Sequence, residues 1–227
     1  MPSSKTTSAA TPPFGSAPSS APDNHDSQAN LYFWKTIPAD PGYLSQWYSM
    51  PFTSPDYPGI VFPTAEHYMM YGKAVLFAGP SDPIGAEILS NLNPKAVKGL
   101  GRKIPNFDEE VWNKHRERIV QDGNYFKFTS PVPNAEGWVI KGKTLPELLL
   151  ATGDRLLVEA SPFDKIWGVG MDEDNADRAA RSKWGLNLLG KALMVVRERI
   201  RAEQSKQEEG QEEKSEEAAE KEQKGTG

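Results

Sequence analysis

The sequence predicts an α+β fold: a single, mostly helical domain of about six helices with a small sheet of short strands. Two observations support this class. Several segments combine apolar residues at helical spacing with a capping side chain or a stopping glycine. The apolar runs with strand character are few and short, and they do not alternate regularly with the helices. This irregular order argues against a doubly wound parallel sheet.

Both ends of the chain have the composition of disordered segments. Residues 1–30 are rich in Ser and Pro, and residues 203–227 form a Glu/Lys-rich run without large apolar side chains. We expect the first to be a disordered tail and the second to be disordered or to continue the preceding helix. The folded domain then spans residues 31–202, which is long enough for one sizeable core.

Three short strands are predicted, two in the first part of the domain at Leu31–Trp34 and Ile60–Phe62, and one later at Leu156–Val158. The helices are predicted from capping residues, some followed by a proline that suits the first turn, at Thr64, Ser81-Asp-Pro83, Asn93-Pro94, Asp108 and Thr144. The helix after Asp108 should turn four side chains inward: Val111, Trp112, His115 and Ile119. A last core helix is predicted from Leu186, Leu189, Leu193, Val196 and Ile200.

Charge and cysteine content exclude several classes of site. The net charge of −5 arises in the final Glu/Lys-rich segment, so acids and bases balance elsewhere. A neutral body argues against a broad electrostatic contact with duplex nucleic acid and leaves room for a local basic groove. The absence of cysteine excludes disulfides and thiolate sites. Without a secretory signal, a transit signal or a membrane-length run, we expect a soluble cytoplasmic or nuclear protein.

Two charged residues lie on one stripe of the helix that follows Thr64. Glu66 and Lys73 share this stripe with Met70, and it otherwise reads as buried. Buried charges of this kind are typical of catalytic pairs. Each residue also has a structural explanation, because the helix dipole favours an early acid and a lysine can extend to water. The same dipole should lower the pKa of Glu66 and keep it ionised.

A second dense stretch follows the last predicted strand. Asp164 and Trp167 are three residues apart, and Trp167 has a ring that can stack on a base. Gly168 and Gly170 would let the backbone approach a ligand closely. The alternative is a turn with a core tryptophan. Two glycines in GxG spacing do not indicate a dinucleotide site without a βαβ context.

Metal and cofactor sites are not indicated. His67 and Tyr71 are four residues apart, where a structural hydrogen bond is favoured over metal binding. The three histidines show no metal-ligand spacing, and no motif indicates a cofactor. Arg102 suits a phosphate, although a surface arginine explains it equally well.

Taken in order, these segments resemble the NADAR (YbiA-like) family. The matching motifs are FPTAEHYMMYGKA, LGR, KF, LLLATGDRLLVEASPFDKIWGVG and NLLGKALMVVRERI, and they span about residues 31–201. The resemblance implies a YbiA-like fold and N-glycosidase activity. It places the catalytic role on Glu66, Lys73, Asp164 and Trp167. It places substrate binding on Ser45, Trp47, His67, Arg102, Gly168, Gly170 and Asn187. Ser45-Gln46-Trp47 departs from the Ser-Asn-Phe that is frequent in the family.

The resemblance implies two substrate classes, ADP-ribose on guanine bases of nucleic acid and phosphorylated ribosylamino pyrimidines of riboflavin biosynthesis. Both carry an N–H on the ribose C1, so the sugar ring can open to an imine. We expect Lys73 to attack C1 as a Schiff-base nucleophile, with Glu66 as proton shuttle. Asp164 would hold the ribose hydroxyls, and Trp167 would stack on the base. A direct route, in which Glu66 activates water, is the alternative.

The choice of substrate depends on the charge near the pocket. ADP-ribose has two phosphates, and Arg102, Lys103 and Lys127 are candidates to bind them. The neutral body favours the smaller metabolite instead. A third alternative is a non-catalytic module that binds ADP-ribose or a nucleotide, because disordered flanks are common in interaction proteins. The sequence leaves the oligomeric state open.

Overall fold

The computed structural model describes residues 30–36 and 41–225, so the N-terminal tail predicted at 1–30 lies outside the described residues except for Asn30. The described helices are α1 (Ala65–Ala78), α2 (Pro83–Ser90), α3 (Pro94–Leu100), α4 (Glu109–Thr129), α5 (Leu145–Leu150), α6 (Glu173–Arg178) and α7 (Leu188–Gly225). Two short 3₁₀ turns lie at Gly42–Leu44 and Arg181–Lys183.

The strands form three separate pairs among the described residues, where a single small sheet was predicted. They are β1 (Asn30–Phe33) with β6 (Leu156–Glu159), β2 (Phe52–Thr53) with β3 (Val61–Phe62), and β4 (Val139–Ile140) with β5 (Lys143–Thr144). The α+β class with a mostly helical domain is confirmed. Only β1 and β6 are parallel, and Phe33 pairs with Glu159. The C-terminal ends of both strands therefore lie side by side, and the segments that follow them begin next to each other.

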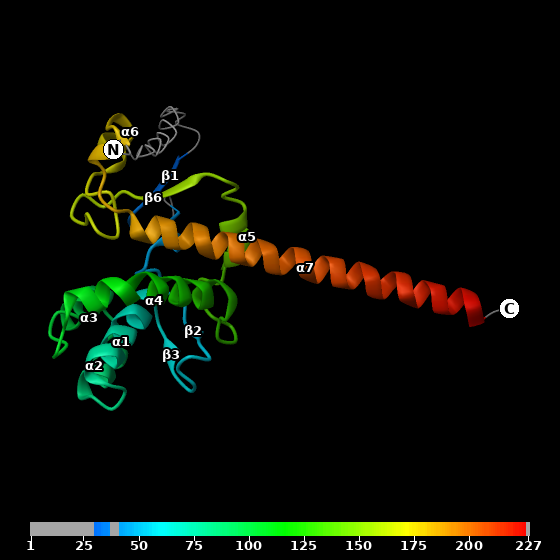
Figure 1. The fold of residues 1–227 in the computed structure, drawn as a ribbon, viewed down its shortest axis with the longest axis horizontal. Helices are drawn as coiled ribbons and strands as arrows, with labels where there is room; N and C mark the ends of the chain where they lie inside the picture. Colours follow the sequence, from blue (N-terminus) through cyan, green and yellow to red (C-terminus); the bar gives the residue numbers. More distant parts are fainter. Residues whose placement is uncertain (1–29, 37–40, 226–227) are drawn as a thin grey trace, which may run out of the picture.

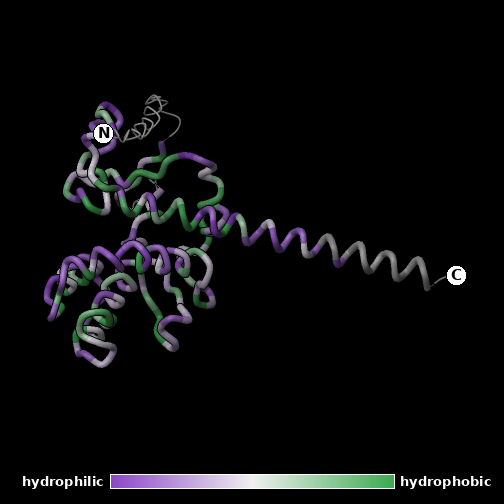
Figure 2. The backbone as a smooth tube through the Cα atoms, viewed as in Figure 1, coloured by the Kyte–Doolittle hydropathy of each residue, from purple (hydrophilic) through white to green (hydrophobic). Residues whose placement is uncertain are grey.

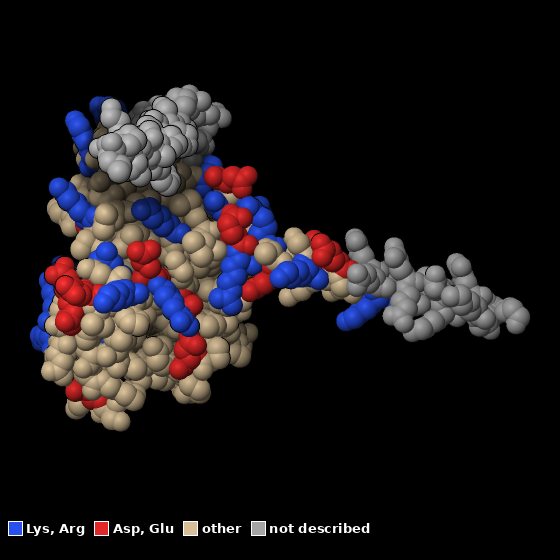
Figure 3. All heavy atoms as spheres, in the orientation of Figure 1, with Lys and Arg blue, Asp and Glu red and all other residues tan. Residues whose placement is uncertain are grey.

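The body has two parts with α7 between them (Figure 1). One part holds α1 to α4 and the β2–β3 pair, and the other holds the β1–β6 pair and α6. The first turns of α7 pack against α4 and β6. The rest of α7 projects away from the body, and the coloured part of this projection is mostly hydrophilic (Figure 2). Charges of both signs are interspersed on the visible face of the body (Figure 3), in agreement with its balanced composition.

Side-chain caps explain where the helices begin. Thr64, Asp82, Asn93 and Asp108 each accept a hydrogen bond from a backbone N–H in the first turn of α1 to α4, respectively. These bonds satisfy donors that the helix itself leaves unpaired. α5 begins instead with a reciprocal capping box between Thr144 and Glu147. The predicted cap positions are confirmed, and within the predicted start at Ser81-Asp-Pro83 the capping residue is Asp82.

The core lies where α1, α4 and α7 meet. Its fully buried side chains include Phe33, Phe52, Phe62, Phe128, Leu145, Leu157 and Leu189. Two inward predictions were wrong. His115 is exposed because the buried stripe of α4 passes through Trp112 and Val120 instead. Leu186 is half-exposed because it precedes the first turn of α7. None of the described helices has the length and apolar character needed to cross a bilayer.

One buried charge joins α4 to the segment that leads into the site. The side chain of Lys127 is fully buried, and its Nζ donates to the carbonyls of Tyr43 and Ser45 at 2.6 and 2.9 Å. One turn earlier, Asn124 donates to the Gln46 side chain at 2.9 Å. Burial lowers the pKa of Lys127 to about 7. Lys127 is therefore a structural clamp, and it does not lie where a phosphate would bind.

Lys127→Met should change how stability depends on pH. The folded pKa is about 7 and the ordinary value is 10.5, so between these values the unfolded chain binds the extra proton. The free energy of unfolding contributed by Lys127 must then rise with pH across this window, by up to about 1.4 kcal/mol per pH unit. We expect the wild type to gain about 2 kcal/mol over Lys127→Met between pH 7 and 9, as measured by urea unfolding.

The exposed Lys191 on α7 provides the matched control for this measurement. Lys191→Met removes an amine of the same chemistry from water, so its stability should follow the wild-type pH dependence. The wild type and both variants contain the same carboxyl groups. The contribution of these groups to the pH dependence of stability is therefore removed when two of the proteins are compared. Parallel pH curves for the wild type and Lys127→Met would contradict the burial of the charged amine.

Candidate active site

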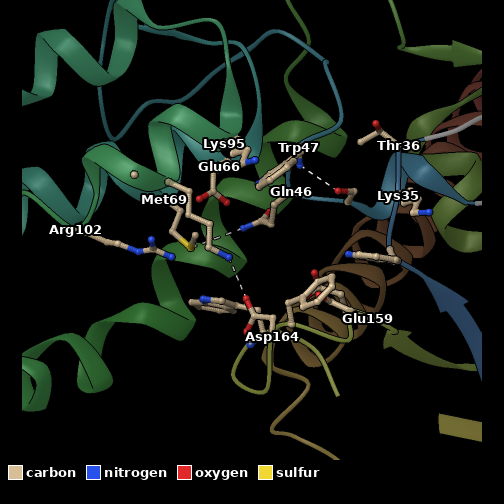
Figure 4. Close-up of a pocket in the computed structure, with 17 residues that line it drawn as sticks. Lys35, Thr36, Gln46, Trp47, Glu66, Met69, Lys95, Arg102, Glu159 and Asp164 are labelled. Carbon is tan, nitrogen blue, oxygen red and sulfur yellow. Dashed lines mark hydrogen bonds and ion pairs between the residues drawn. The ribbon is translucent and has the colours of Figure 1, made fainter. Parts of the chain in front are cut away.

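A cavity of about 700 Å³ opens between the two parts of the body. One wall comes from α1 and α3, and the other from the ends of β1 and β6 with the loops that follow them (Figure 4). The residues that line it are Trp34, Lys35, Thr36, Ser45, Gln46, Trp47, Glu66, Met69, Lys95, Lys98, Gly99, Arg102, Glu159, Ser161, Phe163, Asp164 and Trp167. Its size suits a nucleotide-sized ligand.

Glu66 lies on the α1 wall of the cavity. It is the second residue of α1, and its backbone N–H donates to the Gln46 carbonyl at 3.0 Å. The side chain is only 2 % exposed, and no described group hydrogen-bonds to its Oε1. Burial raises the pKa of Glu66 to about 7, although the charge of Lys98 and a hydrogen bond from Trp47 act against the rise. The expected lowering by the helix dipole was wrong, because desolvation outweighs it.

Glu159 supplies a second carboxyl group from the other wall, and the residue is partly buried. It is the last residue of β6, and its Oε2 also has no hydrogen-bond partner among the described groups. Burial, with the charge of Asp164 as the next contribution, raises the pKa of Glu159 to about 8. Glu159 was not among the residues predicted for the site. The available signal was an acid that ends an otherwise apolar strand.

The backbone around Glu159 is held from behind the cavity. The Asn187 side chain accepts from the Glu159 N–H at 3.0 Å and donates to the Leu157 carbonyl at 2.9 Å. Gly168 packs so closely that a Cβ there would lie 2.6 Å from the Glu159 carbonyl oxygen. Gly170 has a φ of 72°, which favours glycine. These three residues do not line the cavity, and they shape the loop that carries Asp164 and Trp167.

Asp164 organises the loop that follows β6. Its Oδ1 accepts from the backbone N–H groups of Ile166 and Trp167 at 3.0 and 2.8 Å. Its Oδ2 forms an ion pair with Lys98 at 3.1 Å, which joins this loop to α3 (Figure 4). Trp167 lines the cavity beside it, as predicted for an active-site residue, while its role stays a prediction.

Three cationic residues from α3 and its end line the cavity. Lys95, Lys98 and Arg102 are three and four residues apart, so they share one face. Arg102 was among the predicted site residues, whereas Lys95 and Lys98 were missed. Lys103, which was considered for phosphate binding, is not part of the lining.

Lys73 lies outside the cavity lining. Its Nζ donates to the Gly101 carbonyl at 2.8 Å and lies 4.1 Å from the centre of the Phe107 ring. Burial lowers the pKa of Lys73. The predicted stripe from Glu66 is present on α1, but the long side chain carries its amine to the C-terminal end of α3. The structure therefore does not bring Lys73 together with Glu66.

The remaining predicted residues divide into two groups. Ser45 and Trp47 line the cavity, and the Ser45 hydroxyl accepts from the Trp47 N–H at 3.2 Å. His67 is fully buried away from the cavity, where its ring nitrogens bond to the Thr64 hydroxyl at 2.8 Å and the Asn91 carbonyl at 2.6 Å. His67 is thus structural. No described cluster of histidine and acidic residues could hold a metal ion.

The chain is similar in sequence to several known proteins. The chain is 40 % identical over 136 residues to an N-glycosidase of Acanthamoeba polyphaga mimivirus. The aligned residues cover 60 % of this chain and 72 % of that protein. An N-glycosidase of Nostoc punctiforme is 33 % identical over 139 residues, 61 % of this chain and 74 % of the relative. The chloroplastic riboflavin biosynthesis protein PYRR of Zea mays is 27 % identical over 175 residues, 74 % of this chain and 24 % of the relative.

Among solved structures, the NMR structure of the E. coli protein YbiA matches with a TM-score of 0.57 and 25 % identity, covering 78 % of this chain and 88 % of that one. The likeness includes the mixed α+β architecture. The family model described as the NADAR domain matches residues 32–201, which is nearly the whole body. The chain therefore belongs to the NADAR domain family.

Proposed function

We propose that the protein is an N-glycosidase that hydrolyses the bond between ribose C1 and a base nitrogen. The observation that carries the proposal is the pair of carboxyl groups, Glu66 and Glu159, that line one cavity. Each has one buried oxygen without a hydrogen-bond partner among the described groups. Two carboxyl groups flanking the scissile bond are the usual machinery of glycoside hydrolysis. The two relatives named N-glycosidase support the same activity.

The two carboxyl groups suit different steps. At neutral pH the raised pKa of about 8 keeps Glu159 protonated, and the pKa of about 7 leaves Glu66 ionised for part of the time. Glu159 then donates its proton to the leaving nitrogen, and Glu66 accepts a proton from the attacking nucleophile. The charge of Lys98 lowers the pKa of both groups, and that of Asp164 raises both. The hydrogen bond from Trp47 acts on Glu66 alone and favours its ionised form.

The substrate that we propose is ADP-ribose attached to guanine of nucleic acid. Lys95 and Arg102 place two cations along the α3 wall, which suits the charge of a diphosphate. Trp167 offers a ring against which a base can stack. A second candidate is a phosphorylated ribosylamino pyrimidine, and the similarity to the Zea mays riboflavin biosynthesis protein favours it.

A covalent route, in our proposal, uses Lys98. Lys98 lines the cavity, where its amine pairs with the carboxylate of Asp164, whereas Lys73 lies outside the lining with its amine bonded to the Gly101 carbonyl. Glu66 takes a proton from the Lys98 ammonium, and the amine adds to C1 of the ring-opened imine. The C1–N bond to guanine breaks as Glu159 protonates the leaving nitrogen. Water then hydrolyses the Lys98 Schiff base, which releases ADP-ribose and restores the amine.

Release of ADP-ribose from an ADP-ribosylated guanine oligonucleotide tests the function. We expect Glu66→Gln and Glu159→Gln each to lose about 10²- to 10⁴-fold in kcat, because each removes a proton-transfer group. Glu87→Gln, an exposed α2 change, should keep wild-type activity. Chromatography of the products and circular dichroism of each variant provide the readout and the folding check.

Running the same assay on ribosylamino pyrimidine phosphates separates the alternatives. Release from the pyrimidine alone would reassign the substrate within the N-glycosidase class. Binding of ADP-ribosylated guanine without release by the wild type would favour a non-catalytic module. Full activity in either glutamine variant would remove that carboxyl group from the mechanism.

Borohydride trapping tests the identity of the lysine. Reduction during turnover should attach the ribose carbon to Lys98 through a stable secondary amine, and peptide mass spectrometry would locate it. Lys98→Arg should abolish the adduct, and Lys73→Arg should keep it. An adduct on Lys73 would contradict the assignment, and the lack of any adduct would favour direct attack by water.

A further inference from the structure

Two aromatic rings lie side by side at the mouth of the cavity. Phe163 is 87 % exposed, and its ring centre lies 6.1 Å from that of Trp34, with the ring planes tilted by 55°. Both residues line the cavity. Exposure of a phenyl ring to this extent leaves most of its apolar surface in water, where it can gain from a flat ligand.

Both rings are held by the parallel strand pair. Trp34 directly follows β1, and Phe163 follows β6 by four residues. Phe33 and Glu159 are paired across the strands, and the Ala160 N–H donates to the Phe33 carbonyl at 2.8 Å. The Asp164 turn fixes the next part of the loop. The backbone of the platform is therefore organised before a ligand arrives, which lowers the entropy lost on binding.

One cation lies against the Trp34 ring, and others line the same cavity. Lys35 Nζ lies 4.9 Å from the centre of the Trp34 ring, and Lys35, Lys95 and Arg102 are exposed where they line the cavity. In Figure 4, Lys35 and Arg102 lie at opposite ends of the lining. Aromatic rings combined with exposed cations suit a strand with bases and phosphates. This local group of charges coexists with a body whose net charge is balanced, so duplex binding is not favoured.

We propose that Trp34 and Phe163 form a stacking platform for the nucleobase next to the modified guanine, so that the enzyme acts on single-stranded nucleic acid. This proposal rests on the proposed function and names the form of its substrate. Stacking on the platform needs a base with an open face, which a single strand offers and an intact duplex does not. A free mononucleotide conjugate has no adjacent nucleotide. The adenine of its ADP-ribose is not the base that we place on the platform, so the conjugate gains nothing there.

The test compares two substrates that share one scissile bond. One is a short single-stranded oligonucleotide with ADP-ribosylated guanine at its centre, and the other is the corresponding mononucleotide. Phe163→Ala should lower the oligonucleotide-to-mononucleotide ratio of kcat/KM about tenfold, since one stacked base contributes on the order of 1–3 kcal/mol. Leu92→Ala, which removes an 81 % exposed side chain outside the cavity, should leave this ratio unchanged.

A binding measurement keeps the two proposals separate. Fluorescence anisotropy with an unmodified, labelled oligonucleotide needs no hydrolysis, and it should show weaker binding by Phe163→Ala than by Leu92→Ala. Weaker binding together with no turnover of either substrate would reject the proposed function and retain the platform. An unchanged kcat/KM ratio, or equal oligonucleotide binding by the two variants, would overturn the platform.

Discussion

Glu66 and Glu159 bring two carboxyl groups into one cavity, each with an oxygen atom that no described group satisfies. Loss of water around an ionised carboxylate that is incompletely hydrogen-bonded costs on the order of several kcal/mol, so both groups shift toward the neutral form. This cost can persist only because the rest of the fold fixes both backbones. A Thr64 cap and the Gln46 carbonyl hold the start of α1, and the Asn187 side chain holds the end of β6.

The arrangement of the helices and strands around the cavity fixes the backbones that carry the two carboxyl groups. Segments far apart in the chain form the two walls, and α4 supports the segment between them through Lys127 and Asn124. The Lys98–Asp164 ion pair bridges the cavity between α3 and the loop after β6. These contacts turn local helix and strand ends into a site in which positive charge, acid and aromatic surface are close together. Substrate charge and proton transfer are then served by separate residues.

The sequence was sufficient for the features that depend on neighbouring residues. Caps such as Thr64 and Asp108, and the apolar spacing of α7, follow from local backbone chemistry. The sequence was insufficient for side-chain positions and burial that depend on tertiary packing. Glu66 and Lys73 do lie on one stripe of α1. The long side chain of Lys73, however, places its amine at the Gly101 carbonyl and not beside Glu66. Glu159 carries no local signal beyond its place at a strand end, and its raised pKa arises from burial that only the assembled fold creates.

The raised pKa values of Glu66 and Glu159 underlie their proposed roles, and these values can be measured without substrate. Difference infrared spectroscopy across a pH titration, with Glu66→Gln and Glu159→Gln to assign the bands, reports each carboxyl stretch directly. We expect protonated bands that disappear with apparent pKa values of about 7 and about 8 for the pair. Titration of both groups near the ordinary value of 4.5 would show that they are solvated, which contradicts the proposed roles of the two acids.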